Sequence, residues 1–238
     1  MIDKIIDISE NIAIIPARGQ SKRIPRKNIR FFLGKPLIAY TIEAAIKSKL
    51  FSMIIVSTDS EEIAEISKKY GAEVPYLRDK NLSDDFCPVS LATLDVIEKL
   101  ESESEKYTYV AQLMANCPLR DHSDIIDSYR QFIETDSASQ ISIMKYGWFN
   151  PWWAMECDEH HKLSPLFTEQ LNKRSQDLPK LYCPTGAIWW AKVESLKKEK
   201  TFHTNNKSGW EISVINGIDI DTEEDWEIAE LFMKYQRA

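Results

Sequence analysis

The feature of this sequence with the clearest chemical potential is a cluster of cationic side chains near its start. Six of them lie between positions 18 and 30: Arg18, Lys22, Arg23, Arg26, Lys27 and Arg30. The whole chain has a formal net charge of -7, so the cluster opposes the overall balance. A local positive site on an acidic protein favours a small, highly charged anion over a long polyanion. The alternative is a solvated basic turn.

The same loop has the backbone features of a phosphate site. Pro16 and Pro25 stiffen it because each ring fixes φ, and Gly19 allows backbone N–H groups to approach a phosphate closely. Arg18 is suited to grip two phosphate oxygens at once, whereas Lys22 supplies a mobile point charge. Neither the pattern G-x-x-x-x-G-K-[ST] nor the pattern G-x-G-x-x-G is present. A triphosphate held by a cationic loop is the interpretation that remains.

A second group of chemically capable residues lies near the end of the chain, in IDIDTEED at 218–225. If 218–221 is a strand, Asp219 and Asp221 point to one face, because strand side chains alternate. Two convergent carboxylates suit Mg²⁺, which retains several waters and shares substrate phosphates. The alternative is a strand-end turn before a helix cap, with Thr222 and Asp225 in capping-box positions. The cationic loop makes metal binding the preferred interpretation.

The cationic loop is the first of an ordered set of motifs. They are PARGQSKRIPRKNI, GKPLIAYTIEAA, IIVSTDSEEIAE, YGAEVPYLR, CPLR, PTGAI and IDIDTEED. In that order they resemble the acylneuraminate cytidylyltransferase family, whose members activate nonulosonic and related 2-keto-3-deoxy sugar acids with CTP. SKRIPRKNI is especially close to the enzymes for bacterial sialic-acid-like sugars such as pseudaminic acid. The resemblance implies transfer of CMP to the anomeric hydroxyl of the sugar acid, with release of pyrophosphate, for surface glycan biosynthesis.

The residues and the resemblance together assign roles along the chain. The expected catalytic residues are Arg18, Lys22 and Asp221; the expected nucleotide contacts are Ala17, Arg18, Gly19, Ser21, Lys22, Asn28 and Arg78; the expected sugar-acid contacts are Asn116, Arg174, Gln176, Thr185 and Trp189; and the expected cofactor is Mg²⁺ on Asp219 and Asp221. Arg174 suits the sugar carboxylate because a planar guanidinium pairs with a carboxylate through two hydrogen bonds. A rim salt bridge is the alternative for Arg174, and a surface position is the alternative for Arg78.

The sugar side of the site departs from the family pattern. Met114 stands where the family has glutamine, and Cys117 where it has serine. Cys183 and Thr185 replace an arginine and an asparagine. Asn116 is a substitute for the missing amide, because its side chain both donates and accepts hydrogen bonds. These changes point to a less usual or more substituted sugar acid and leave the phosphate side intact.

The elements that must position these residues alternate between strands and helices. Strands are predicted at 12–16, 53–56, 73–77 and 107–114, and helices after Pro36, after Ser60, over 88–101, after Ser123 and after Thr222. In the first helix, Ile38, Ile42, Ala45 and Ile46 are expected to face the sheet. The alternation predicts βαβ units and a mainly parallel sheet. The expected fold class is α/β, a three-layer Rossmann-like nucleotidyltransferase fold with helices on both faces.

One aromatic-rich segment interrupts this alternation. It contains Tyr146, Trp148, Phe149, Trp152, Trp153 and Phe167. Aromatic side chains at this density require burial. The resemblance implies an excursion that packs against a partner subunit and lends it active-site residues. We therefore expect a homodimer, with 1–238 as one cytidylyltransferase domain and a dimerisation or lid insertion at about 146–180. A self-contained subdomain core is the alternative.

Composition and charge limit the cellular location and the alternative functions that fit the sequence. No apolar run approaches the roughly 18–20 residues of a membrane span, and MIDKIIDISEN, with charges among its apolar positions, is unlike a secretory signal. Four separated cysteines without a C-x-x-C pair are typical of a reduced, cytoplasmic protein. A single basic run on an acidic chain argues against nucleic-acid binding. The remaining rivals are a non-catalytic sugar-nucleotide-binding protein, and a nucleotidyltransferase for 3-deoxy-octulosonate or with GTP.

Overall fold

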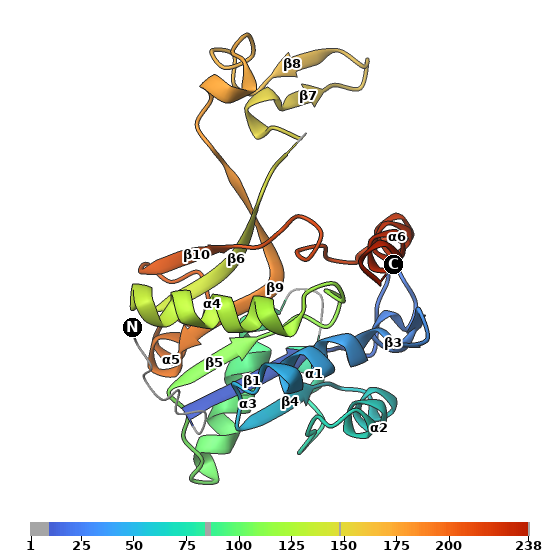
Figure 1. Ribbon diagram of the computed structural model, residues 1–238, viewed down its shortest axis with the longest axis vertical. Coiled ribbons are helices and arrows are strands. Elements are labelled where there is room, and N and C mark those ends of the chain that lie inside the picture. The colour runs from blue at the N-terminus through green and yellow to red at the C-terminus, as the bar shows by residue number, and fades with distance from the viewer. Residues whose placement is uncertain (1–9, 84–86, 148, 238) are drawn as a thin grey trace.

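The computed structural model describes residues 10–83, 87–147 and 149–237, and its body is built on a six-stranded sheet (Figure 1). The strand order is β10-β6-β9-β5-β1-β4. The bounds are β1 (Asn11–Pro16), β4 (Met53–Ser57), β5 (Tyr109–Gln112), β6 (Ser139–Lys145), β9 (Tyr182–Lys192) and β10 (Lys207–Glu211). Strand β1 is buried along its whole length, as expected for a central strand.

The pairing of the strands determines where the loops gather. β1 pairs in parallel with both β4 and β5, and β10 pairs in parallel with β6. β9 is antiparallel to its neighbours β5 and β6. Because parallel strands end at the same edge, the loops after β1, β4 and β5 meet there. This edge holds the site described below.

Helices cover both faces of the sheet and make three layers. Ala13 and Ile15 pack with residues of α1, α2 and α4, while Ile12 and Ile14 pack with residues of α3 and α5. The bounds are α1 (Leu37–Ser48), α2 (Glu61–Lys69), α3 (Val89–Ser102), α4 (His122–Thr135), α5 (Val193–Glu199) and α6 (Glu223–Arg237). The predicted α/β class with a mainly parallel sheet is confirmed. None of these helices has the length and apolar character that crossing a membrane requires.

Local signals set several helix ends as the sequence predicts. The Ser60 side chain accepts a hydrogen bond from the backbone N–H of Ile63 at the start of α2. Thr222 and Asp225 exchange hydrogen bonds before α6, which is a capping box. Each bond satisfies a backbone donor that the first turn leaves without a helical partner. Helix α6 then buries Trp226, whose ring packs edge-on against Phe32.

Four local predictions are wrong. The segment 73–77 makes only one bridge, Ile55 with Glu73, and is not a strand of the sheet. Residues 218–221 are irregular, so no strand aligns Asp219 with Asp221. Helix α4 is capped by Asp121 and not by Ser123, because Asp121 and Asp124 form the reciprocal capping box. Ile46 is 43% exposed, at the edge of the buried stripe of α1.

Between β6 and β9 the chain leaves the body as an arm, defined here as residues 146–181 (Figure 1). It carries the two-stranded β7 (Met155–Cys157) and β8 (Leu163–Pro165), with the short 3-10 helices η4 (Pro151–Trp153) and η5 (Ser175–Asp177). A second small hairpin, β2 (Phe31–Phe32) with β3 (Lys35–Pro36), and the 3-10 helices η2 (Lys27–Ile29) and η3 (Lys80–Leu82) complete the described elements. Trp148, part of the predicted aromatic segment, lies outside the described residues.

Candidate active site

A cavity of about 280 Å³ lies at the edge where β1, β4 and β5 end. Its walls come from the loop after β1, from Arg78, from the segment that leads into α3, from the residues after β5, and from Asp221. The lining residues are Pro16, Arg18, Ser21, Lys22, Arg23, Ile24, Lys27, Asn28, Arg78, Leu82, Ser83, Cys87, Val89, Ala92, Met114, Ala115, Asn116 and Asp221. Five cations against one carboxylate make this a cavity for an anion.

Backbone contacts hold the cationic loop in place over the sheet edge. The Ala17 N–H donates to the Ser57 carbonyl, which continues the pairing of β1 with β4 by one residue. The Gly19 N–H donates to the Asp59 carboxylate at 2.7 Å. The Asn28 side-chain amide donates to the Arg18 carbonyl at 3.1 Å and so closes the loop on itself. Asp59 therefore holds the loop from the segment just before α2.

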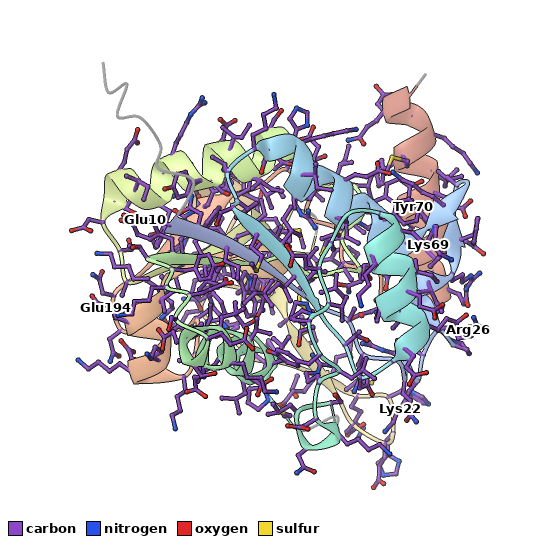
Figure 2. All side chains as sticks on the ribbon, turned by 90° about the horizontal axis from the view of Figure 1, so that it is seen from below. Glu10, Lys22, Arg26, Lys69, Tyr70 and Glu194 are labelled. Carbon is purple, nitrogen blue, oxygen red and sulfur yellow. The ribbon has the colours of Figure 1, made fainter. Side chains whose placement is uncertain are left out.

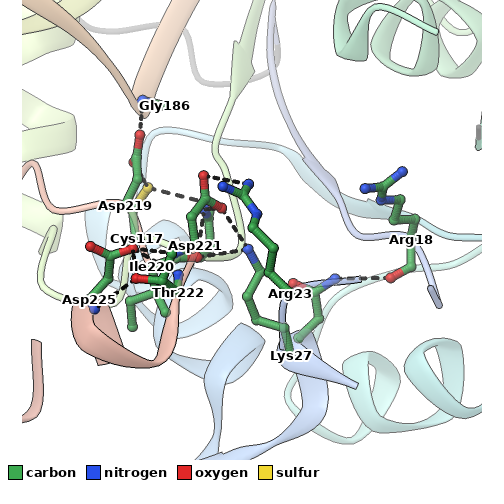
Figure 3. A network of polar contacts seen from close by, with 12 residues as sticks. Arg18, Arg23, Lys27, Cys117, Gly186, Asp219, Ile220, Asp221, Thr222 and Asp225 are labelled. Carbon is green, nitrogen blue, oxygen red and sulfur yellow. Dashed lines mark hydrogen bonds and ion pairs between the residues drawn. The ribbon is translucent and has the colours of Figure 1, made fainter. Parts of the chain in front are cut away.

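The structure brings the cationic loop and the late aspartates together, although they are almost 200 residues apart in sequence (Figure 3). Asp221 accepts from the Lys27 ammonium at 2.9 Å and pairs with the Arg23 guanidinium at 2.9 Å. Lys27 also donates to the Ile220 carbonyl at 2.7 Å. Burial raises the pKa of Asp221, but Lys27 and Arg23 outweigh it and hold the pKa below the ordinary carboxyl value. Asp221 is therefore ionised at neutral pH.

Asp219 has a different environment, although it lies only two residues away. Its oxygens accept from the Cys117 thiol at 2.7 Å and from the Gly186 N–H at 3.1 Å (Figure 3). Gly186 is required here, because a Cβ would come within 2.8 Å of Met114. Burial, with the nearby Asp221 charge, raises the pKa of Asp219 above its ordinary value. Burial and the charge of Asp219 likewise raise the pKa of the Cys117 thiol, which is fully buried and remains protonated.

The carboxylates at this edge of the sheet suit a hard cation whose remaining ligands come from a bound phosphate and from water. No three His, Cys, Asp or Glu side chains among the described residues are grouped to hold a metal by themselves. Mg²⁺ needs only one or two carboxylates when phosphate oxygens and water supply the other ligands. Asp221 lines the cavity as a carboxylate, whereas Asp219 is more deeply buried and is not among the lining residues. The two aspartates would thus hold Mg²⁺ weakly by themselves and more tightly together with a phosphate in the cavity.

Arg78 lines the same cavity. It is 6% exposed, and its Nε donates to the Ser83 hydroxyl at 3.0 Å. Burial lowers the pKa of its guanidinium, and the Asp59 charge opposes that shift. A buried, oriented cation is a specific hydrogen-bond donor for a ligand group, whereas the surface position that was the alternative for Arg78 is excluded.

The sequence-predicted residues divide into three sets by position. Arg18, Ser21, Lys22, Asn28, Arg78, Asn116 and Asp221 line the cavity, while Ala17, Gly19 and Asp219 support it from behind. Thr185 and Trp189 lie in β9 away from the cavity: the buried Thr185 hydroxyl accepts from the Ala187 N–H, and the Trp189 ring packs against Phe202 and His203. Arg174 and Gln176 lie on the arm, where Arg174 pairs with Asp177 at 2.7 Å. Within one chain, these last four do not meet the cavity.

From the sequence, Arg23 and Lys27 are predicted only as members of the cationic cluster. In the structure both form ion pairs with Asp221. The only signal was their position in the basic run. The other two cations of that run point elsewhere. Arg26 pairs with Glu62 of α2, beside which it lies in Figure 2, and Arg30 pairs with Glu223 of α6 and lies over the Trp226 ring. Four of the six cations of the loop therefore line the cavity. The other two, Arg26 and Arg30, tie the loop to α2 and α6.

Comparison with known proteins places the chain in a defined group. A sequence model described as cytidylyltransferase matches residues 12–230. The chain is 38% identical over 225 residues to a pseudaminic acid cytidylyltransferase of Campylobacter jejuni, covering 94% of this chain and 97% of that one. It is 33% identical to a CMP-N,N'-diacetyllegionaminic acid synthase of Legionella pneumophila, covering 94% and 96%. A solved CMP:2-keto-3-deoxy-manno-octonic acid synthetase complexed with CTP shares the fold, with a TM-score of 0.72 at 15% identity, covering 95% and 99%.

Proposed function

The chain belongs to the cytidylyltransferase family, and on that premise we propose that it transfers CMP from CTP to the anomeric hydroxyl of a nonulosonic acid of the pseudaminic type. The sugar class is supported by the similarity to a pseudaminic acid cytidylyltransferase, which exceeds that to a legionaminic acid enzyme. The observation that carries the proposal is the cavity in which cations of residues 18–27 face the carboxylate of Asp221. The setting we propose is surface glycan biosynthesis in the cytoplasm.

In this proposal the chain acts mainly by position and charge. Arg18 and Lys22 bind the β- and γ-phosphates of CTP from the cationic loop, and Arg78 lies at the nucleoside end of the cavity. The anomeric hydroxyl oxygen forms a bond to the α-phosphorus, the bond from that phosphorus to the bridging oxygen breaks, and pyrophosphate leaves while the hydroxyl proton passes to solvent. Fixed cations stabilise the charge that moves onto the leaving group. No covalent enzyme intermediate is needed.

Mg²⁺ is the proposed cofactor, and Asp221 with Asp219 would hold it beside the phosphates. When bound, Mg²⁺ neutralises phosphate charge and polarises the reacting phosphoryl group. The chain's part is to keep Asp221 ionised, which the contacts from Lys27 and Arg23 do. Asn116 orients the same carboxylate through its side-chain amide at 3.4 Å.

The arm supports the proposal of a homodimer. Eight large apolar side chains between residues 146 and 182 are at least 36% exposed: Tyr146, Phe149, Trp153, Met155, Leu163, Leu166, Phe167 and Tyr182. Among the described residues of the arm, one aromatic pair is in contact: the Trp152 and Phe167 rings lie 5.1 Å apart. Burial of such an apolar surface against a second copy is favourable. It would also give Arg174 and Gln176 a route to the partner's sugar-acid site.

Pyrophosphate release tests the proposal directly. The purified protein is offered CTP, UTP, ATP or GTP with pseudaminic acid, a legionaminic acid, N-acetylneuraminic acid or 3-deoxy-octulosonate. We expect release with CTP and pseudaminic acid at the highest kcat/KM, and no release when either substrate is omitted. Preferred use of 3-deoxy-octulosonate or GTP would support the alternative transferase. Binding of CTP without release in any combination would support a non-catalytic protein.

A further inference from the structure

Every carboxylate oxygen of the two aspartates already has a donor from the protein (Figure 3). Asp219 accepts from Cys117 on one oxygen and from Gly186 on the other. Asp221 accepts from Lys27 and Asn116 on Oδ1, while its Oδ2 pairs with Arg23. A divalent cation that binds Asp221 therefore competes with the cationic donors Lys27 and Arg23 for the same carboxylate and is repelled by their charge.

The donors differ in how readily they can leave. Gly186 donates from the backbone, and the Cys117 thiol is completely buried. The Lys27 side chain is only 14% exposed and has a second anchor on the Ile220 carbonyl. The Arg23 side chain is 63% exposed and holds Asp221 through one contact at 2.9 Å. Since an exposed ion pair contributes little, Arg23 is the partner that can be exchanged.

We propose that Arg23 closes the metal site of the nucleotide-free protein, and that a nucleoside triphosphate opens it by drawing the guanidinium from Asp221 onto a phosphate. The proposal rests on the triphosphate site of the proposed function. Arg23 lines the same cavity as Arg18 and Lys22, so its side chain needs only to turn within the cavity. Charge balance is kept, because the cation moves from a carboxylate to a phosphate while the divalent ion takes its place at Asp221.

This exchange makes metal and nucleotide binding mutually reinforcing. In the free protein Arg23 competes with the divalent cation, and Asp221 competes with the triphosphate for Arg23. Each ligand removes the competitor of the other, so each raises the affinity for the other by the same factor. The proposed order is therefore triphosphate before, or together with, the metal.

Binding of Mn²⁺ to the nucleotide-free protein, followed by electron paramagnetic resonance, tests the closure without turnover or a sugar acid. We expect weak binding by the unsubstituted protein and binding up to about fivefold tighter by Arg23→Ala, the upper end of what one exposed ion pair contributes. Arg23→Lys should keep most of the closure. Arg26→Ala is the matched control, because Arg26 lies in the same loop with similar exposure and pairs with Glu62 on α2. It should bind Mn²⁺ as the unsubstituted protein does.

Two further measurements complete the test. Addition of Asp221→Asn to Arg23→Ala should abolish the gain in Mn²⁺ affinity; a gain that persists places the ion elsewhere and overturns the proposal. Calorimetric CTP binding in EDTA should weaken in Arg23→Ala by about fivefold, because a phosphate contact is lost. Unchanged Mn²⁺ affinity in Arg23→Ala, or unchanged CTP affinity, also overturns it. If CTP is never turned over but Arg23→Ala gains Mn²⁺ affinity, the closure stands and the proposed function fails.

Discussion

Replacement of Cys117 tests how Asp219 is held. The thiol is fully buried and donates to the Asp219 carboxylate at 2.7 Å, so Cys117→Ala removes one of the two donors that the described residues provide to that carboxylate. A hydrogen bond to a charged group contributes about 1.5–3 kcal/mol, and the cavity left by the sulfur adds about 1 kcal/mol. We expect Cys117→Ala to lower the free energy of unfolding by about 3 kcal/mol.

Cys117→Ser is the matched variant because a hydroxyl restores the donor in nearly the same place. Its free energy of unfolding should lie within about 1 kcal/mol of that of the unsubstituted protein. Urea denaturation followed by tryptophan fluorescence measures both differences. The Mg²⁺ concentration for half-maximal pyrophosphate release gives a second reading, which should rise in Cys117→Ala and return toward normal in Cys117→Ser.

The comparison between the two variants is what can refute this reasoning. If alanine and serine at position 117 give equal stability, the Asp219 carboxylate does not depend on a donor there. If both are as stable as the unsubstituted protein, the thiol contributes neither a hydrogen bond nor packing to stability. A loss in both variants that exceeds about 3 kcal/mol would show that the sulfur volume outweighs the hydrogen bond.

The other predictions concern the cavity and the arm. Lys22→Ala should raise the KM for CTP about tenfold, as expected for one lost charged contact, and leave the KM for the sugar acid unchanged; initial rates of pyrophosphate release check this, and unaltered CTP kinetics would reject the phosphate role. The lowered pKa of Asp221 implies stability that is complete above the ordinary carboxyl pKa of about 3.9 and lost as pH falls through the folded value. The stability gap between the protein and Asp221→Asn should therefore narrow below about pH 4 in urea titrations; a gap independent of pH contradicts it. Leu163→Asp on the arm should shift the protein from dimer to monomer in sedimentation velocity, whereas Leu231→Asp, equally exposed on α6, should not; a monomeric unsubstituted protein would remove the dimer proposal.

Short-range chemistry explains which parts of the fold the sequence predicts. The Ser60 cap and the capping box of Thr222 with Asp225 depend on residues three apart, so they can be identified from the sequence. The error at Ser123 has the same origin, because Asp121 two residues earlier is an equally good cap and has Asp124 at the reciprocal position. Local rules predict that a helix starts in a given segment more reliably than they predict the residue at which it starts.

The segment 73–77 shows where periodicity misleads. Ala72 and Val74 are buried in alternation, which is the pattern of a strand. Its backbone nevertheless bonds to β4 only around Glu73, with exchanges to Ile54 and Val56. Alternating burial requires only an extended chain on a core, whereas a strand requires a continuous hydrogen-bonding partner. The sequence contains the first condition and carries no information on the second.

The candidate site shows the same difference between what local sequence predicts and what depends on long-range packing. The residues of the proposed phosphate side, Arg18, Ser21, Lys22 and Asn28, lie on one short loop, so the sequence alone groups them, and all of them line the cavity. The proposed sugar side depends on distant segments. Thr185 is buried in β9 and Trp189 is partly buried there against Phe202, and this packing leaves no local pattern in the sequence.

The pairing of Lys27 with Asp221 joins the two ends of the chain and explains why the irregular segment 218–221 can hold a ligand group in position. Without a strand to align it, this segment depends on side-chain donors: Lys27 and Asn116 both bond to the Ile220 carbonyl and to Asp221. These donors fix the segment and also compete with any metal. The loop proposed to bind the phosphates also supplies Lys27 and Arg23 to Asp221, so under the proposed function a substitution at the nucleotide site is expected to change metal binding as well.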